Sequence, residues 1–328
     1  MKTKIALLGT GEWWGWHHAR ILAEHPDVDF CAIMGRNPER TQARANEFNV
    51  RSYTGIDKML ANEKPDLVSV CLGNKDHYEP TMALIKAGVP LFVEKPLVFD
   101  MKEADALIEE AEKRKLFFAL NFNHRWALPI EKAHQAIKEG KLGNIVYATW
   151  RFGGEGPECH QWENLIETQC HGFDMLEHLC GPIDSIAMHA SDAANKGFSS
   201  YAISLHFSNA AVGGMTGSYD TSYAYPLTHF LEINGTKARI TVEDTVKKYS
   251  FQEVGNETAE VWQAGYFNDK DRMFHYAFDK HFNDMLKAFR AGQEPPVNAR
   301  MGRRALRLAK AAIESFEKNI IVKVTPEY

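Results

Sequence analysis

The segment Glu94-Lys95-Pro96 places a lysine where an open α/β sheet binds its ligands. The apolar run at 89–93 predicts a short, buried parallel strand, and Pro96 prevents that strand from continuing. A residue that precedes proline is restricted to extended backbone angles, so the Lys95 side chain has less freedom to lose when it meets a ligand. Lys95 is a candidate for stabilising negative charge at the end of this strand. The alternative is a solvated lysine that only closes the strand.

A glycine-rich loop follows the first apolar run and precedes the first helical pattern. Glycines let the backbone approach a pyrophosphate, and the helix N-terminus supplies free N–H groups. The third glycine comes one residue later than in the common G-x-G-x-x-G pattern, so a purely structural turn is the alternative. The order of strand, loop and helix favours a dinucleotide site. The loop consists of Gly9, Thr10, Gly11, Glu12, Trp13, Trp14 and Gly15.

The end of the second predicted strand bears on the choice of cofactor. NAD-binding folds usually carry an acidic residue there, which binds the 2′-hydroxyl of the ribose. This chain has Gly35 and Arg36 instead, with Arg40 close behind. A glycine leaves room and a guanidinium pairs well with a 2′-phosphate. The sequence therefore favours NADP(H) over NAD(H), unless Arg36 is merely solvated and Gly35 is a turn residue.

A polar stripe lies in the segment 164–180. Glu167, His171, Asp174 and His178 are spaced four, three and four apart, which would place them on one face of a helix. Buried histidine and aspartate side chains are costly unless they are paired or face a wet cleft. The stripe therefore indicates a catalytic cluster, a metal site or, in the simplest case, a solvated helix face.

Zinc-type ligands occur in and near the stripe, but no CxxC or HExxH spacing is present, so we expect no metal. These residues are Cys159, His160, Glu167, Cys170, His171 and His178.

Short apolar runs alternate with helical patterns up to about residue 121, which predicts a doubly wound parallel sheet. The expected strands are 5–8, 28–34, 67–72, 91–93 and 116–120, and the expected helices are 15–25, 38–48, 57–63, 77–87 and 101–114.

Beyond residue 123 the pattern changes to a series of strands with turn signals, which predicts a mostly antiparallel open sheet. The expected strands are 145–151, 199–207, 211–218, 229–234, 238–241 and 247–252, and the expected helices are 129–139, 271–291 and 299–318.

The length of 328 residues predicts two domains, which we place at 1–122 and 123–328. The second would be an α+β domain. A formal charge of −5 and a pI near 6.3 give no footprint for nucleic acid. Neither a leader segment nor a run of membrane-spanning length is visible. Five cysteines without tight spacing fit a reducing cytoplasm.

Taken together, these motifs resemble those of the glucose-fructose oxidoreductase, inositol dehydrogenase and MocA superfamily. The resemblance is carried, in order, by the glycine loop, by Glu94-Lys95-Pro96 and by the segment from His171 to His178. Gly73-Asn74-Lys75-Asp76-His77 resembles the loop after the fourth strand in this family. Asn121-Phe122-Asn123-His124-Arg125 resembles its connection between domains.

The resemblance implies a catalytic set of Lys95, Asp174 and His178. His178 would exchange the hydroxyl proton, Lys95 would stabilise the developing alkoxide, and Asp174 would orient the base or the sugar hydroxyls. A histidine with a pKa near neutrality would suit that base role. Arg125, Glu167 and His171 would contribute to the sugar pocket. Further expected cofactor contacts are Asn74, His77, Glu94, Lys95 and Asn123.

The implied activity is hydride transfer between a nicotinamide cofactor and a sugar, glycoside or inositol-like polyol. The reacting group would be a secondary alcohol, a ketone or the anomeric carbon. The alternative is a non-catalytic, nucleotide-sensing protein that retains the fold. Family resemblance also implies a homo-dimer or homo-tetramer that pairs through the second-domain sheet. The alternation of Ala202, Ser204 and His206 with apolar neighbours is compatible with such pairing.

Overall fold

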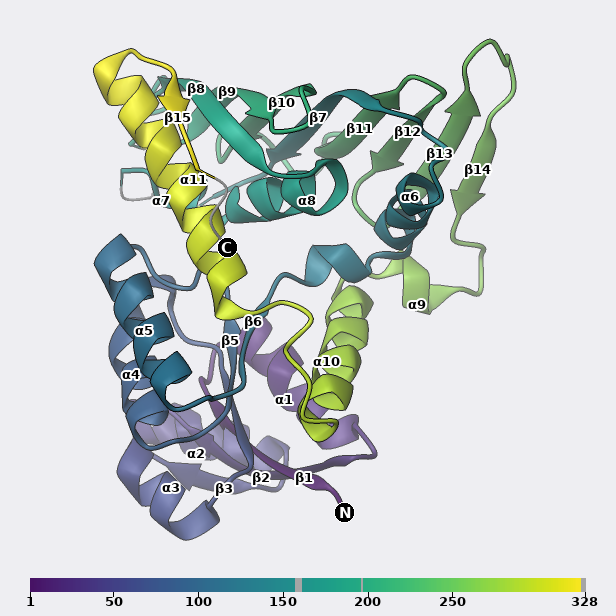
Figure 1. Cartoon of the computed structure of the whole chain (residues 1–328). Helices are drawn as coiled ribbons and strands as arrows, with labels where there is room; N and C mark the ends of the chain where they lie inside the picture. The colour runs from purple at the N-terminus through teal and green to yellow at the C-terminus, as the bar shows by residue number, and fades with distance from the viewer. Residues whose placement is uncertain (157–160, 196, 326–328) are drawn as a thin grey trace. The chain divides into compact units, whose positions relative to one another are not determined.

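The computed structural model describes residues 1–156, 161–195 and 197–325, and the chain forms two compact units (Figure 1). Unit 1 comprises Met1–Asn121 and Phe282–Arg303, and unit 2 comprises Phe122–His281 and Arg304–Tyr328. The expected boundary at 122/123 lies next to the first division. The second expected domain, however, was continuous to residue 328, whereas Phe282–Arg303 belongs to unit 1.

Unit 1 contains a six-stranded parallel sheet in the order β3-β2-β1-β4-β5-β6, which confirms the predicted doubly wound parallel sheet. The short strand β3 was missed, because three residues carry no period that distinguishes them from a loop. The strands are β1 (Thr3–Leu8), β2 (Val28–Met34), β3 (Arg51–Tyr53), β4 (Leu67–Val70), β5 (Leu91–Glu94) and β6 (Phe118–Asn121).

Helices cover both faces of this sheet, with α4 and α5 on one side and α1 and α10 on the other (Figure 1). The helices are α1 (Trp14–Glu24), α2 (Pro38–Glu47), α3 (Ile56–Glu63), η1 (Asn74–Asp76), α4 (Tyr78–Lys86), α5 (Met101–Lys113) and part of α10 (His275–Arg290).

The segment contributed by the C-terminal part of the chain is integral to unit 1. Phe282 is fully buried, and its ring lies 6.0 Å from that of Phe92 in β5. Further along, the carbonyl of Val297 accepts a hydrogen bond of 3.0 Å from the backbone N–H of Leu120 in β6. This segment therefore completes the core and continues the sheet edge beside β6.

Unit 2 contains a nine-stranded sheet in the order β14-β13-β12-β11-β7-β10-β9-β8-β15. Its pairs are antiparallel except for β7 with β10, so the prediction of a mostly antiparallel sheet is confirmed. The strands are β7 (Ile145–Gly153), β8 (Ile183–Ser191), β9 (Ser200–Phe207), β10 (Val212–Ser218), β11 (His229–Gly235), β12 (Ala238–Glu243), β13 (Lys248–Glu253), β14 (Glu260–Gln263) and β15 (Val322–Lys323).

Three of these strands were missed from the sequence. The strand β8 interrupts its apolar alternation with Ser185 and His189, whereas β14 and β15 are short edge strands that bury little. A single helix was also expected at 271–291, but α9 and α10 are separated by Met273 and Phe274.

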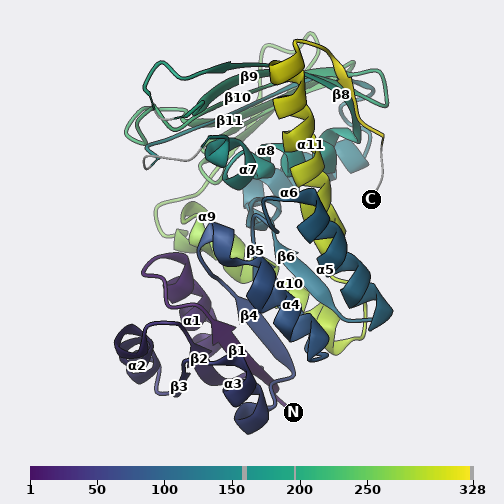
Figure 2. The ribbon, with the colours of Figure 1, turned by 90° about the vertical axis from the view of Figure 1, so that its left-hand side faces the viewer.

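The helices of unit 2 gather on one face of the sheet, where α6, α8 and α11 lie (Figures 1 and 2). In β9, Ile203, Leu205 and Phe207 are buried on that face, while the alternate residues are exposed on the other. Among the described residues, no helix packs against the other face. The helices are η2 (Asn123–Trp126), α6 (Leu128–Lys138), α7 (Glu163–Glu167), α8 (Cys170–Cys180), α9 (Asp269–Arg272) and α11 (Ala299–Lys318), with the start of α10.

Candidate functional site

The glycine loop of unit 1 has a backbone shape that only glycine allows at its first position. Gly9 has a φ of +135°, and a Cβ there would lie 1.9 Å from the carbonyl oxygen of Cys71. Gly15 is also tight, since a Cβ would lie 3.3 Å from the carbonyl carbon of Thr10. Because α1 begins at Trp14, the loop residues lie directly before a helix N-terminus. This is the geometry that receives a pyrophosphate.

A cavity of about 660 Å³ opens beside this loop, within the size range of cofactor sites. Lys75 and Asp76 of η1 and Tyr78 at the start of α4 also line it, whereas Glu12 does not. Eight of the predicted cofactor residues line the cavity: Gly9, Thr10, Gly11, Trp13, Trp14, Gly35, Arg36 and Arg40.

Gly35 has a packing role that the sequence did not reveal. A Cβ at this position would lie 2.6 Å from Oγ1 of Thr41 and 2.8 Å from Cγ2 of Thr10. The absence of an acidic residue at the end of β2 therefore reflects a close approach of side chains, in addition to any preference for a cofactor. A substitution of Gly35 would disturb the loop and would not test the cofactor preference cleanly.

Two arginines lie at the same end of the cavity. Arg36 forms an ion pair with Asp76, with 2.5 Å between Nη2 and Oδ2, but its side chain is 80% exposed. An exposed pair of this kind contributes little to stability, so the guanidinium can exchange its partner for a phosphate. Nε of Arg40 donates a hydrogen bond of 2.9 Å to Oγ1 of Thr10, which ties α2 to the glycine loop.

Glu94 and His77, both predicted to contact the cofactor, are buried behind the backbone of Lys95 and do not line the cavity. Nδ1 of His77 lies 2.8 Å from the carbonyl oxygen of Pro96, and burial lowers the pKa of this histidine. The Asn74 side chain lies outside the described residues. Asn123 is buried in unit 2, where its Nδ2 makes no hydrogen bond to any described residue.

The predicted stripe is divided between two helices in unit 2. Thr168 and Gln169 separate α7 from α8, so Glu167 does not lie on the helix that carries His171, Asp174 and His178. The expectation of a single helix face was therefore wrong for Glu167. On α8, nine of eleven residues are buried, which confirms that this helix is packed.

Asp174 is held by an arginine from η2. Arg125 donates to both carboxylate oxygens, from Nε over 2.8 Å and from Nη2 over 2.5 Å. Only 13% of the Arg125 side chain and 3% of the Asp174 side chain are exposed. Burial raises the pKa of Asp174 above its ordinary value, and the charge of Arg125 offsets that effect in part. The paired carboxylate is a fixed hydrogen-bond acceptor one helical turn from His178.

His178 lies beside His134 of α6, with 4.4 Å between the ring centroids. Burial, together with the charges of Arg125 and His134, lowers the pKa of His178 to about 3. The expectation of a histidine with a pKa near neutrality was therefore wrong, because nothing negative compensates the desolvation. His178 is therefore neutral at physiological pH. No pattern in the sequence pointed to His134, which the packing of α6 and α8 brings beside His178.

His171 and Glu167, the remaining residues predicted to bind the substrate, each contact a different neighbour in unit 2. The ring of His171 stacks on that of His124 at 4.0 Å. The Glu167 carboxylate accepts hydrogen bonds from the hydroxyls of Thr168 and Tyr219. Tyr219 is buried, and burial followed by the charge of Glu167 raises its pKa well above the ordinary value. Tyr219 was missed, because it follows a strand 52 residues from Glu167.

Two residues considered as metal ligands, Cys159 and His160, lie outside the described residues. Within the described part of the chain, no group of three or more His, Cys, Asp or Glu side chains is arranged to hold a metal ion. In the same part, no helix is long and apolar enough to cross a membrane.

We expect the stability of the protein to fall as the pH is lowered from about 6.5 towards about 3, in part because of His178. The unfolded chain binds a proton at this histidine in that range and the folded chain does not, so unfolding is favoured at the lower pH. One such group contributes a slope of up to about 1.4 kcal/mol per pH unit.

The measurement is the free energy of unfolding across this pH range in the parent and in His178→Gln. The substitution should flatten the slope, whereas His189→Gln, at an exposed position, should not. Equal slopes in the parent and in His178→Gln would contradict a depressed pKa at His178.

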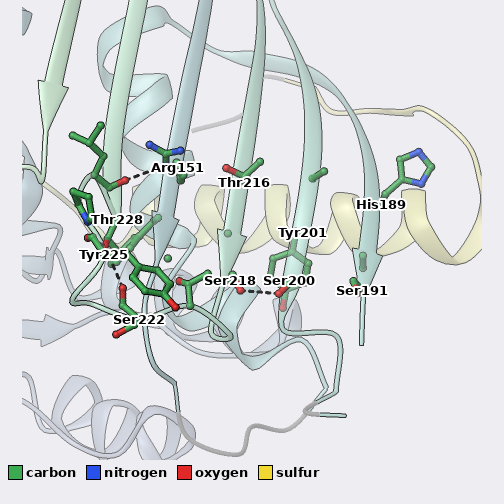
Figure 3. Close-up of a pocket in the computed structure, with 18 residues that line it drawn as sticks. Arg151, His189, Ser191, Ser200, Tyr201, Thr216, Ser218, Ser222, Tyr225 and Thr228 are labelled. Carbon is green, nitrogen blue, oxygen red and sulfur yellow. Dashed lines mark hydrogen bonds between the residues drawn. The ribbon is translucent and has the colours of Figure 1, made fainter. Parts of the chain in front are cut away.

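A second cavity, of about 590 Å³, opens in unit 2 (Figure 3). Arg151, Thr216 and Ser200 lie on adjacent strands in the close-up, and Tyr225 and Thr228 lie on the loop after β10. The hydroxyls of Ser200 and Ser218 are hydrogen-bonded at 2.7 Å. No residue predicted to bind cofactor or substrate lines this cavity.

Comparison with known proteins covers most of the chain. Residues 3–122 match the model of an oxidoreductase family with an NAD-binding Rossmann fold, and residues 134–324 match the C-terminal alpha/beta domain of the same family. The myo-inositol 2-dehydrogenase of Thermotoga maritima is 24% identical, over 98% of each chain. The D-glucoside 3-dehydrogenase of Escherichia coli is 29% identical, over 58% of this chain and 52% of that enzyme.

Solved structures show the same fold. The levoglucosan dehydrogenase in complex with NADH and levoglucosan superposes with a TM-score of 0.89 over 100% of both chains, at 18% identity. The WlbA dehydrogenase from Bordetella pertussis, in complex with NADH and UDP-GlcNAcA, superposes with a TM-score of 0.86 over 99% of both chains, at 18% identity. With both domains matched, the chain belongs to the Gfo/Idh/MocA family of oxidoreductases, as its motifs predicted.

Proposed function

We propose that this protein is an oxidoreductase that transfers a hydride between a nicotinamide cofactor and a sugar, glycoside or inositol-like polyol. The reacting group is a secondary alcohol or ketone, or the anomeric carbon. The proposed catalytic residues are Lys95, Asp174 and His178. The observation that carries the proposal is the buried Arg125–Asp174 pair one turn from a neutral histidine, in a chain that also has a dinucleotide cradle.

The cradle fits a dinucleotide on structural grounds. Gly9 has a positive φ, and the carbonyl oxygen of Cys71 occupies the space that a Cβ would fill, so the backbone of the loop stays bare directly before α1. When bound, the nicotinamide accepts or supplies the hydride. The residues of this chain supply the binding site, the orientation and the proton transfer.

His178 is the proposed acceptor of the hydroxyl proton in the oxidative direction. Because its pKa is lowered to about 3, its ring is neutral throughout the range in which the enzyme would work. The charge of Arg125 favours release of the proton once it has been taken up. Lys95, as an ammonium group, stabilises the negative charge that develops on the substrate oxygen.

Asp174 is the proposed orienting group, since its carboxylate is fixed by two hydrogen bonds from Arg125. Glu167 and His171 are proposed to form the wall of the sugar pocket. Each is held by a neighbour, Glu167 by Tyr219 and His171 by its stack on His124. Groups fixed in this way can bind polyol hydroxyls with little loss of side-chain entropy.

We propose that NADP(H) is preferred over NAD(H), because Arg36 and Arg40 line the cavity at the end of β2. Arg36→Glu should weaken NADP(H) binding by about tenfold or more and leave NAD(H) binding within about threefold, since only the former carries a 2′-phosphate. Calorimetric titration with both cofactors measures this. Arg114→Glu, at an exposed arginine directly after α5, is the control. Equal effects of Arg36→Glu on both cofactors would show that Arg36 does not discriminate between them.

We also propose that the protein forms a homo-dimer or homo-tetramer through the open face of the unit 2 sheet. The face carries small residues such as Ala202 and Ser204, with Val212 53% exposed and the second cavity beside them. Covering such a surface with a second copy would remove apolar area from water.

Four described cysteines are free thiols, which fits the proposal that the protein works in a reducing cytoplasm.

The proposed activity is tested by a panel of aldoses, glycosides and inositols, each incubated with NAD and NADP in parallel. The absorbance of the reduced cofactor reports turnover, and the reverse reaction is followed with the matching ketones. Turnover of at least one polyol supports the proposal. Dinucleotide binding without turnover across the panel in either direction would contradict it and would favour a nucleotide-sensing protein.

A further inference from the structure

A chain of buried polar side chains runs behind Lys95 within unit 1. His18 of α1 is 1% exposed, and its two ring nitrogens lie 2.7 Å from Oγ of Ser69 in β4 and 2.9 Å from Oε1 of Glu94 in β5. Nδ2 of Asn121 in β6 donates to the same oxygen of Glu94. The Glu94 carboxylate thus connects α1 with β6, and His18 extends the chain of contacts to β4.

The hydrogen bonds determine how His18 and Glu94 are protonated. Burial raises the pKa of Glu94, but the bond and charge of His18, the charge of Lys95 and the bond from Asn121 outweigh it, so the pKa lies below its usual value. An ionised carboxylate can only accept hydrogen bonds, so Nε2 of His18 carries a proton. If the His18 ring is neutral, the hydroxyl of Ser69 donates a hydrogen bond to its Nδ1. If the ring is charged, Nδ1 donates to the hydroxyl oxygen of Ser69.

This carboxylate also holds the backbone of the lysine. Oε2 of Glu94 accepts a hydrogen bond of 3.2 Å from the N–H of Lys95. On the other side, His77 lies within hydrogen-bond distance of the carbonyl oxygen of Pro96. The main chain is therefore held on both sides of Lys95 by buried side chains.

A gain in stability does not explain why His18 and Glu94 are buried together. Burying an ion pair rarely stabilises a fold more than apolar residues of the same volume would. The other buried groups near Lys95 do not supply the same charge, because burial raises the pKa of Cys71 and lowers that of His77. Both are neutral near pH 7, so Glu94 is the negative neighbour of Lys95 among these groups.

We propose that His18 is a positioning residue for Lys95: it holds Glu94 as an oriented carboxylate, which fixes the Lys95 backbone and balances its ammonium charge. The proposal rests on the proposed function only in giving Lys95 a catalytic role. His18 acts through Glu94, without contact to substrate. The network itself can be tested without any substrate.

The first experiment measures the rate at which a small amine-acylating reagent modifies Lys95 near pH 8, by peptide mass spectrometry. Loss of the neighbouring negative charge lowers the pKa of an ammonium group and makes it more reactive. Glu94→Gln should therefore raise the rate by about tenfold, equivalent to about one pKa unit. His18→Leu should act in the same direction, because burial then drives Glu94 towards its neutral form.

Two variants serve as controls. His18→Gln can still donate to Glu94 and should stay within about twofold of the parent. Glu63→Gln changes another buried carboxylate of unit 1, which pairs with Lys4 and Arg51 and is remote in sequence from Lys95. An unchanged rate in Glu94→Gln, or an equal rise in Glu63→Gln, would overturn the proposal.

The second experiment uses turnover, once a substrate is known. His18→Leu should lower kcat by about tenfold with the KM for the cofactor within about twofold, and His18→Gln should restore most of kcat. Equal losses in both His18 variants would point to a structural role and overturn the proposal. If the parent shows no turnover, the proposed function fails, while the acylation experiment still decides the role of His18.

Discussion

Lys95→Met should lower kcat for polyol oxidation by about 10²–10³-fold, because the substitution removes the ammonium charge that stabilises the developing alkoxide. Methionine has a similar length and no charge, so the strand end and the cis Lys95–Pro96 bond should remain. The dissociation constant of the dinucleotide should stay within about threefold of the parent, since Lys95 does not line the cavity beside the glycine loop. Steady-state kinetics and equilibrium binding on the same preparation measure both.

The matched control is Lys102→Met, at an exposed lysine in the first turn of α5. It should keep the parental kcat and the parental affinity for the cofactor. If Lys95→Met also turned over at the parental rate, the mechanism proposed for this set of residues would be wrong. A loss of cofactor binding equal to the loss of kcat would instead make Lys95 a cofactor ligand.

Arg125→Met should lower the free energy of unfolding by about 3–5 kcal/mol at neutral pH, because it leaves the Asp174 carboxylate buried without its partner. The pKa of Asp174 is already raised by burial and should rise further without the guanidinium. A carboxyl with a raised folded-state pKa stabilises the fold below its unfolded pKa and loses that contribution as the pH rises. The deficit should therefore be smaller near pH 4 than near pH 8.

A double variant separates the ion pair from the packing around it. Arg125→Met with Asp174→Leu removes both charges and should recover most of the lost stability, since an apolar pair of similar volume is often neutral. Lys247→Met, which breaks an exposed pair with Asp244, should change stability by less than about 1 kcal/mol. A single variant as stable as the parent, with no dependence on pH, would show that Arg125 does not compensate Asp174.

Local order in the sequence was enough to predict where the glycine loop and Lys95 lie in the fold. The glycine loop lies between a strand and a helix, and Lys95 follows a buried strand directly, so sequence position alone determines where these residues lie. The face of α8 was predicted for the same reason, because His171, Asp174 and His178 keep a helical spacing. Local periodicity carries this information within one element.

The features of the site that could not be predicted from the sequence depend on packing between distant segments. Arg125 and Asp174 are 49 residues apart, and no sequence pattern around either residue predicts that they form an ion pair. The break between α7 and α8 falls at Thr168-Gln169, where neither glycine nor proline marks a stop. The low pKa of His178 follows from burial and from two positive neighbours, which appear only when α6, η2 and α8 have come together.

The segment Phe282–Arg303 belongs to unit 1 but is synthesised long after the rest of that unit. The ring of Phe282 lies beside Phe92, three residues before Lys95, and Val297 pairs with β6. During synthesis on the ribosome, the first 121 residues emerge long before these late partners do. The strand that precedes Lys95 therefore lacks these partners until about the last seventh of the chain has been made, and a nascent chain released before that point would expose the apolar surface that Phe282 covers.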